Sequence, residues 1–229
     1  MDFSITIFRA IRITDNLNLY ITETIVITWI IIGLFLALAV LVKIKSRKWS
    51  AMGKPSGLQN VMEFLVSSFE NIFTNSAGDK VLYLAPWFFT LFAFLIVSNT
   101  IGITGFRPPT ADWSMTFPLA LSSFFLIQFA GIKHRPKEFL KSFFQPIFVF
   151  FPLNVMGELS KPISMSFRLF GNVLGGMILM SLLYGLAPFV LTLGIPAVLH
   201  AYFDVAVGIL QAFIFLILSI TFVGLAAEE

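Results

Sequence analysis

The sequence predicts an all-α polytopic membrane protein, with about five transmembrane helices and one amphipathic helix on the inner surface. Of its 229 residues, 58% are hydrophobic and 28 are phenylalanine, an apolar share well above that of a soluble domain. The apolar residues form long runs, and about 20 residues suffice for a helix to cross a bilayer. A β-barrel would show short alternating segments instead. Lysines and arginines gather beside the ends of these runs, as in multi-pass membrane proteins.

Composition also excludes several classes of site. The chain has no cysteine, so disulfides and thiolate chemistry are excluded. The two histidines, His134 and His200, are too few and too far apart for a histidine metal site, and His134 is expected to be solvated within a basic loop. The chain has no G-x-x-x-x-G-K-[ST] phosphate loop, and we expect no cofactor. The net charge of +3 is modest, so we expect no nucleic-acid partner.

The N-terminal third contains one span and one amphipathic segment. Residues 1–21 are polar and mixed, without the apolar core of a signal peptide. Residues 22–44 form the first span. It is followed by a basic cluster, Lys43, Lys45, Arg47, Lys48 and Lys54. By the positive-inside rule this end is cytoplasmic, or faces the matrix or stroma of an organelle, and the N-terminus lies outside. Residues 55–73 have apolar positions at helical spacing and predict a helix on the inner surface. A cytosolic helix packed on the bundle is the alternative.

The second and third spans support the same orientation. Residues 82–104 run outward, and residues 115–132 run inward. The inward span is followed by Lys133, Arg135, Lys137 and Lys141. Both basic clusters therefore fall on one side of the membrane, which is the expected cytoplasmic side of a bacterial plasma membrane. The C-terminus is expected on that side too.

The last two helical stretches are longer than a membrane span requires. They cover residues 146–186, beginning at Pro146 or Pro152, and residues 196–227. Each could reach about 45–50 Å, whereas the bilayer core is about 30 Å thick. They must therefore be steeply tilted, broken or protruding. Residues 185–196 would form the outer turn. No repeat or linker divides the chain, so residues 1–229 are expected to be one membrane domain.

Arg168 stands inside the first long stretch. A fixed cation at membrane depth costs at least about 2.5–3.5 kcal/mol, and arginine keeps its charge in proteins. Glu158 is ten residues earlier, about 15 Å along a helix, so no carboxylate of the chain is an obvious partner. We expect Arg168 to face a partner protein's carboxylate or an aqueous path, with Asn172 and Gln211 orienting it. The alternatives are extension to the interface, or an internal polar cluster in which the amides only join helices.

Polar residues form one stripe on each of the two long stretches. The last stretch carries His200, Asp204, Gly208, Gln211, Phe215 and Ser219. The preceding stretch carries Asn154, Glu158, Lys161, Met165, Arg168, Asn172 and Gly175 or Gly176. Residues spaced three and four apart share one helix face, and a polar face within a membrane must meet protein or water.

Because the two stretches are antiparallel, we expect Gln211 beside Arg168. Asp204 is then expected near Gly175, with His200 one turn further out. Glycine at that level leaves room for an ionisable side chain or water between the helices.

The stripes predict three levels of polar groups. These are Asp204 and His200 toward the outside, Arg168 with Asn172 and Gln211 near the middle, and Glu158 with Asn154 and Lys161 toward the inside. Protonatable groups above and below a permanent cation suit an ion path that is interrupted at its centre. Asp204 and His200 could instead satisfy only each other, and Glu158 and Lys161 could form only an interfacial ion pair.

Four motifs resemble one known family. S-K-P-I-S-M-S-F-R-L-F-G-N at 160–172 and L-Q-A-F-I-F-L-I-L-S-I-T-F-V at 210–223 are similar to subunit a of F-type ATP synthases. P-S-G-L-Q-N-V-M-E-F at 55–64 and P-T-A-D at 109–112 look like the family's earlier motifs. The order of the motifs argues against a chance similarity, and the resemblance covers nearly everything after residue 55.

The resemblance implies a non-catalytic stator subunit that couples the flow of H⁺ or Na⁺ to rotation and ATP synthesis. Its implied partners are the c-subunit ring, the b subunits of the peripheral stalk, the whole F1Fo complex and the lipid bilayer. Arg168 matches the family's essential arginine, which would separate two aqueous half-channels, and Asn172 and Gln211 match the polar residues beside it. Many members carry glutamate where this chain has Met177, and some of those carry histidine where it has Asp204.

Two other functions remain as hypotheses. A secondary transporter would bind substrate near the midplane, often within an inverted repeat, and the sequence shows no repeat. A channel or a purely structural subunit would have no evident use for ionisable groups at three separate depths.

Overall fold

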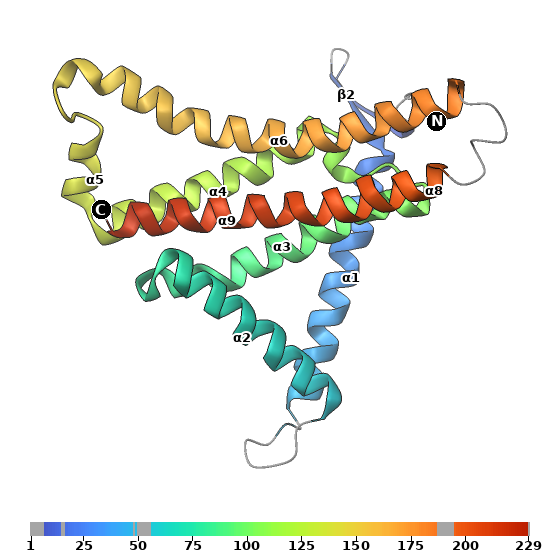
Figure 1. Cartoon of the computed structure of the whole chain (residues 1–229), viewed down its shortest axis with the longest axis horizontal. Coiled ribbons are helices and arrows are strands. Elements are labelled where there is room, and N and C mark those ends of the chain that lie inside the picture. The colour runs from blue at the N-terminus through green and yellow to red at the C-terminus, as the bar shows by residue number, and fades with distance from the viewer. Residues whose placement is uncertain (1–6, 15–16, 48, 50–55, 187–194, 229) are drawn as a thin grey trace.

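A computed structural model describes the chain except for residues 1–6, 15–16, 48, 50–55, 187–194 and 229 (Figure 1). Lys48, Lys54 and most of the predicted outer turn therefore lie outside the described residues. The described part contains five helices that are long and apolar enough to cross a membrane: Glu23–Ser46, Asp79–Thr104, Trp113–His134, Phe148–Gly185 and Val198–Glu228. The predicted all-α polytopic class is confirmed.

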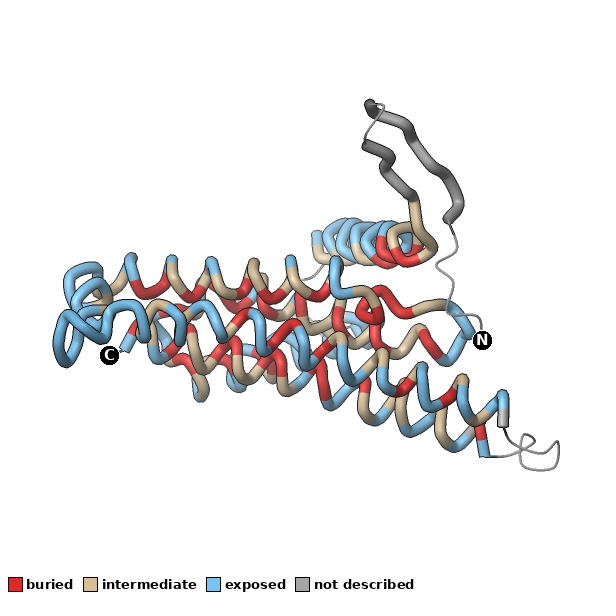
Figure 2. Tube along the Cα trace, turned by 90° about the horizontal axis from the view of Figure 1, so that it is seen from above, coloured by how far each residue is buried: buried red, intermediate tan, exposed pale blue. Residues whose placement is uncertain are grey.

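The N-terminal segment contains structure that the sequence did not predict. Strands β1 (Ile7–Thr14) and β2 (Leu17–Thr22) pair antiparallel and lead into helix α1 (Glu23–Ser46). Helix α1 runs steeply across the direction of α6 and α9 in Figure 1, and it is foreshortened in the perpendicular view of Figure 2. It buries residues only in its first half, and most of its surface is exposed and apolar. An apolar exposed helix suits contact with lipid.

Helix α2 (Gly57–Ala77) packs on the bundle at one end only. The Ser56 hydroxyl accepts a hydrogen bond from the Gln59 backbone N–H and caps its start. Phe69 and Phe73 are buried, whereas the apolar residues of its first turns remain exposed. Gly224 of the last helix allows the close approach, because a Cβ there would lie 2.7 Å from the Cα of Ala77. The helix therefore has both predicted characters, a packed end and an exposed apolar surface.

The middle of the chain forms the core. Segment η1 (Asp79–Leu84), helix α3 (Ala85–Thr100) and segment η2 (Ile101–Thr104) make one span, and helix α4 (Trp113–His134) makes the next after the turn η3 (Pro109–Ala111). Fully buried apolar residues from these helices meet those of α2 and the last helix in one cluster. His134 is half-buried near the Tyr83 ring and has a buried Nε2, so the expectation of a solvated histidine was wrong.

The arginine-bearing helix begins late. A short helix α5 (Pro136–Ser142) and the turn η4 (Phe148–Phe150) precede helix α6 (Phe151–Leu186). The 36 residues of α6 correspond to about 54 Å. Since α1 and α6 run in very different directions (Figure 1), they cannot both stand upright in a bilayer. With α1 upright, α6 must be strongly tilted, as its length also requires.

The last span is not a uniform α-helix. Helix α8 (Ile195–His200) continues into the π-helical segment η5 (Ala201–Val207) and then into helix α9 (Gly208–Glu228). A π-helical insertion changes the direction in which side chains point, and such insertions are frequent at functional sites. The sequence predicted a helix over 196–227 but gave no signal for this insertion. Asp204 lies within it.

Candidate functional site

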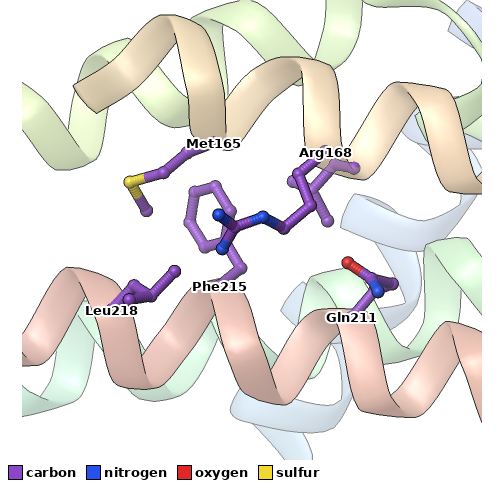
Figure 3. Close-up of a pocket in the computed structure, with 6 residues that line it drawn as sticks. Met165, Arg168, Gln211, Phe215 and Leu218 are labelled. Carbon is purple, nitrogen blue, oxygen red and sulfur yellow. The ribbon is translucent and has the colours of Figure 1, made fainter. Parts of the chain in front are cut away.

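Arg168 projects from the middle of α6 on an exposed surface. Figure 3 shows its side chain reaching toward α9, in front of the Phe215 ring. The shallow pocket around it, whose space of about 160 Å³ includes open solvent, is lined by Met165, Arg168, Leu169, Gln211, Phe215 and Leu218. Within the described part of the chain, the ion pairs join other residues and none includes Arg168. The cation is thus unpaired by the described residues, and most of the residues that line its pocket are apolar.

Gln211 is the polar residue that lines this pocket together with Arg168. Its side chain is 8% exposed, and its Oε1 is buried without a hydrogen-bond partner. A buried acceptor without a partner costs about 1–3 kcal/mol. Water or a rotated Arg168 side chain could remove that cost, because both donate hydrogen bonds.

Small residues lie on the exposed face of α6 that carries Arg168. Small exposed residues continue the arginine's stripe in both directions along α6: Gly157, Ser160, Ser164, Gly171 and Gly175. A Cβ added at any of its three glycines would meet no atom within 4 Å. Small residues allow helices to approach closely in membranes. This surface can therefore accept another helix close to the guanidinium.

A second, more polar pocket begins one turn beyond Arg168. It has about 290 Å³ of empty space and is lined by Asn99, Asn172, Val173, Gly176, Phe203, Asp204, Val207, Gly208 and Gln211. Gln211 belongs to both pockets. The predicted middle and outer levels are therefore adjacent in the fold. Gly175, which was expected beside Asp204, would meet nothing within 4 Å with an added Cβ, and a Cβ at Gly176 would meet Phe203. The glycine packed on Asp204 is instead Gly102 of η2, so that expectation was wrong.

Asp204 and His200 form a close pair toward the outer end. The carboxylate Oδ2 lies 2.6 Å from His200 Nδ1, and both side chains keep some exposure. Nε2 of the same ring lies 3.4 Å from the hydroxyl of Tyr184 on α6. The carboxylate also packs on Gly102, where a Cβ would lie 3.0 Å from Asp204 Cγ. These contacts form a chain of groups that can hold or pass a proton.

Asn99 and Thr110 complete this outer region, and the sequence analysis missed both. The Asn99 amide donates to the Gly208 carbonyl oxygen at 2.8 Å, and the Thr110 hydroxyl donates to Asn99 Oδ1 at 2.7 Å. Both residues are almost fully buried. They tie α3 and the outer loop to the end of the π-helical segment. An asparagine within an apolar span was a usable signal, because a buried amide needs partners.

The inner level contains a second polar group. Glu158 pairs with Lys161 on α6, and Gln128 of α4 donates to its Oε2 at 3.3 Å. Asn154 is used differently, because its amide donates to the carbonyl oxygens of Phe143 and Gln145, each at 2.9 Å. The structure thus brings Glu158 and Lys161 together but directs Asn154 toward the preceding loop.

Comparison with known proteins agrees with this arrangement. The family model described as "ATP synthase A chain" matches residues 25–224. The chain belongs to this family. The relatives include ATP synthase subunit a of Trichlorobacter lovleyi, which is 37% identical over 212 residues, covering 90% of this chain and 88% of the relative. Subunit a of Moorella thermoacetica is 37% identical over 206 residues, covering 89% of this chain and 90% of the relative.

A third relative, ATP synthase subunit a 3 of Pelobacter propionicus, is 37% identical over 207 residues and covers 88% of this chain and 86% of the relative. The resemblance found in the four motifs is thereby confirmed. The chain is a multi-pass membrane subunit of an F-type ATP synthase.

Proposed function

We propose that the chain is the stator ion-channel subunit of a rotary ATP synthase, non-catalytic by itself. It provides two offset aqueous half-channels for H⁺ or Na⁺, and Arg168 faces the carboxylates of a turning c-subunit ring. An ion neutralises a ring carboxylate through one half-channel and leaves through the other after the ring has turned. One charge crossing 100 mV releases about 2.3 kcal/mol, so ATP-scale work requires a rotor that adds several steps.

One observation carries this proposal: Arg168 is exposed, and it is unpaired by the residues that the structure describes. A membrane cation without a carboxylate is costly, which fits a partner that supplies carboxylates in turn. The small residues on either side of Arg168 suit a surface past which other helices slide. Asn172 and Gln211 then limit where the guanidinium can point.

The outer half-channel passes the polar pocket that contains Asp204. His200 and Tyr184 extend it toward the outer side, and Gln211 connects it to Arg168. The inner half-channel passes Glu158. Asn154 supports the inner end indirectly, because the loop before α6 occupies its amide.

The orientation follows from the basic residues. Lys43 and Lys45 end α1, and Lys133 follows the inward span, so these ends are cytoplasmic in a bacterial plasma membrane. The N-terminus then lies outside and the C-terminus inside. The exposed apolar surface of α1 is available to lipid and to the b subunits of the peripheral stalk in the F1Fo complex.

Cross-linking tests the proposal directly, because the chain has no native cysteine. Ser164→Cys and Gly171→Cys place thiols on the exposed face of Arg168. Leu169→Cys is the matched control, because Leu169 is adjacent but only 1% exposed. Each variant is assembled with c subunits that carry a cysteine beside the ring carboxylate.

Because each thiol forms a single disulfide, oxidation after turnover should link the two exposed positions to every ring subunit across the population of complexes, one bond per complex. The buried control should not react. A bond to one fixed neighbour at both exposed positions, or no bond at either, would overturn the stator assignment. The result would then favour a transporter or a structural subunit.

A further inference from the structure

The chain between α5 and α6 exposes an unusual group of aromatic residues. Val149 is 78% exposed and Phe148 is 71% exposed. The rings of Phe144, Phe148 and Phe151 are stacked, with centroids 4.8–6.3 Å apart and planes within 11° of parallel. We name residues 144–151 the aromatic loop. Exposed apolar patches of this kind mark contact with a partner or a membrane.

The aromatic loop is held in a defined shape by the residues on both sides of it. The Asn154 amide donates to the carbonyl oxygens of Phe143 and Gln145. On the other side, the Phe139 ring packs on the backbone of Gly131, where a Cβ would lie only 2.5 Å from the ring. Phe139 also meets the Phe143 ring edge to face at 5.4 Å. The fold therefore presents the stacked rings outward instead of burying them.

Basic side chains accompany the rings. Lys137 and Lys141 are four residues apart on α5, so they share one helix face, and both are exposed. Glu138, the acidic residue of α5, is paired with Arg135. The exposed charge beside the aromatic loop is therefore positive. Phenylalanine on the apolar face of an interfacial segment enters the boundary between headgroups and acyl chains, and clustered lysines favour a surface of anionic lipids.

We propose that the aromatic loop and α5 form a membrane anchor that inserts into an anionic leaflet. Phe148 and Val149 enter the acyl boundary, while Lys137 and Lys141 contact lipid phosphates. A lipid surface fits better than a protein, because it matches both the apolar rings and the uncompensated positive charge. The loop leads directly into α6, so the anchor would fix the inner end of the helix that carries Arg168. It does not depend on the presence of a c ring.

Spin labelling of the full chain in vesicles tests this anchor. Val149→Cys is labelled, and Lys80→Cys is the matched control because Lys80 is exposed on the turn before α3, outside the aromatic loop. Accessibility to oxygen and to a water-soluble nickel chelate is compared in phosphatidylcholine vesicles with and without phosphatidylglycerol. The label at 149 should prefer oxygen and move deeper when phosphatidylglycerol is present. The label at 80 should remain accessible to the chelate.

A double variant, Lys137→Gln with Lys141→Gln, separates the two parts of the anchor. It should abolish the phosphatidylglycerol-dependent shift while leaving the preference of the label for oxygen. A label at 149 as accessible to the chelate as the one at 80 would overturn the proposal. So would a label shielded from both reagents in the assembled synthase whatever the lipid, because a protein partner would then cover the loop. A shift that survives the double variant would overturn the role of the lysines.

Discussion

Two arginines of this chain differ in how their charge is satisfied. Arg107, in the outer loop, donates from Nη2 to Asp112 Oδ1 at 2.7 Å, and their side chains are 15% and 14% exposed. Thr24 of α1 donates to the other oxygen of the same carboxylate at 2.7 Å. Arg168, on α6, is exposed and joins no ion pair of the described residues. The Asp112 carboxylate joins the Arg107 loop to α1, whereas Arg168 makes no comparable link among the described residues.

The comparison predicts that removing Arg168 affects function and removing Arg107 affects stability. Observing the reverse would contradict it. Arg168→Ala should abolish ATP-driven ion pumping and ion-driven ATP synthesis, because it removes the group proposed to hold each ring carboxylate ionised. The fold should be unaffected, since Arg168 forms no ion pair with the residues that the structure describes. Pumping into membrane vesicles and the amount of assembled complex are the measurements. Retained coupling with normal assembly would contradict the role of Arg168.

Arg107→Ala should show the opposite behaviour. Breaking a buried ion pair costs about 3–5 kcal/mol, and we expect the lower end because both side chains keep some exposure. The thermal unfolding temperature of the detergent-solubilised chain should fall, and less complex should assemble. The complex that does assemble should pump at a normal rate per molecule. A stable variant with no coupling would mean that Arg107 acts in ion transfer and that the two arginines are not so different.

Asp204→Asn tests the proposed role of Asp204 in the outer half-channel. The amide keeps the shape of the side chain but cannot gain or lose a proton as a carboxyl group does. Passive ion flux through the membrane sector without F1 should fall by about tenfold. This is less than the roughly 10²–10⁴-fold effect of a positioned acid–base group in catalysis, because water in the pocket also carries protons. An unchanged flux would assign Asp204 to a structural pair with His200. Glu158→Gln is the corresponding change at the inner level.

Gly102→Ala tests the same carboxylate from segment η2, which packs against it. The new Cβ would lie 3.0–3.2 Å from three atoms of Asp204, closer than most real contacts, so the carboxylate must move. We expect a several-fold loss of passive flux, smaller than for Asp204→Asn because the titratable group remains. Gly33→Ala is the control, since a Cβ there would meet nothing within 4 Å. Equal flux in the two variants would argue against a constrained position for Asp204.

Much of this arrangement could be predicted from single residues. The tilt of α6 follows from its length, and the polar stripes placed Arg168 beside Gln211. They did not predict the glycine that meets Asp204, which is Gly102 of η2 and not the expected Gly175 of α6. The π-helical segment could not be predicted, because residues 201–207 have the apolar composition of an ordinary span and their register depends on contacts with α3. Asn154 was misleading for a related reason: helical spacing gives its face, whereas its partners are carbonyl groups of an irregular loop.

The Tyr184 variant has the smallest expected effect. It tests whether the tyrosine hydroxyl takes part in ion transfer together with His200 and Asp204. Its hydroxyl lies 3.4 Å from His200 Nε2, longer than a good hydrogen bond between such groups, whereas the His200–Asp204 contact is 2.6 Å. Tyr184→Phe should therefore lower passive flux by less than about twofold if pocket water can replace the hydroxyl. Tyr202→Phe, on the exposed side of the π-helical segment, is the control and should change nothing. A loss as large as that of Asp204→Asn would place Tyr184 on the obligatory ion path. The relay would then begin on α6, with the tyrosine hydroxyl and the histidine ring acting as one unit ahead of Asp204.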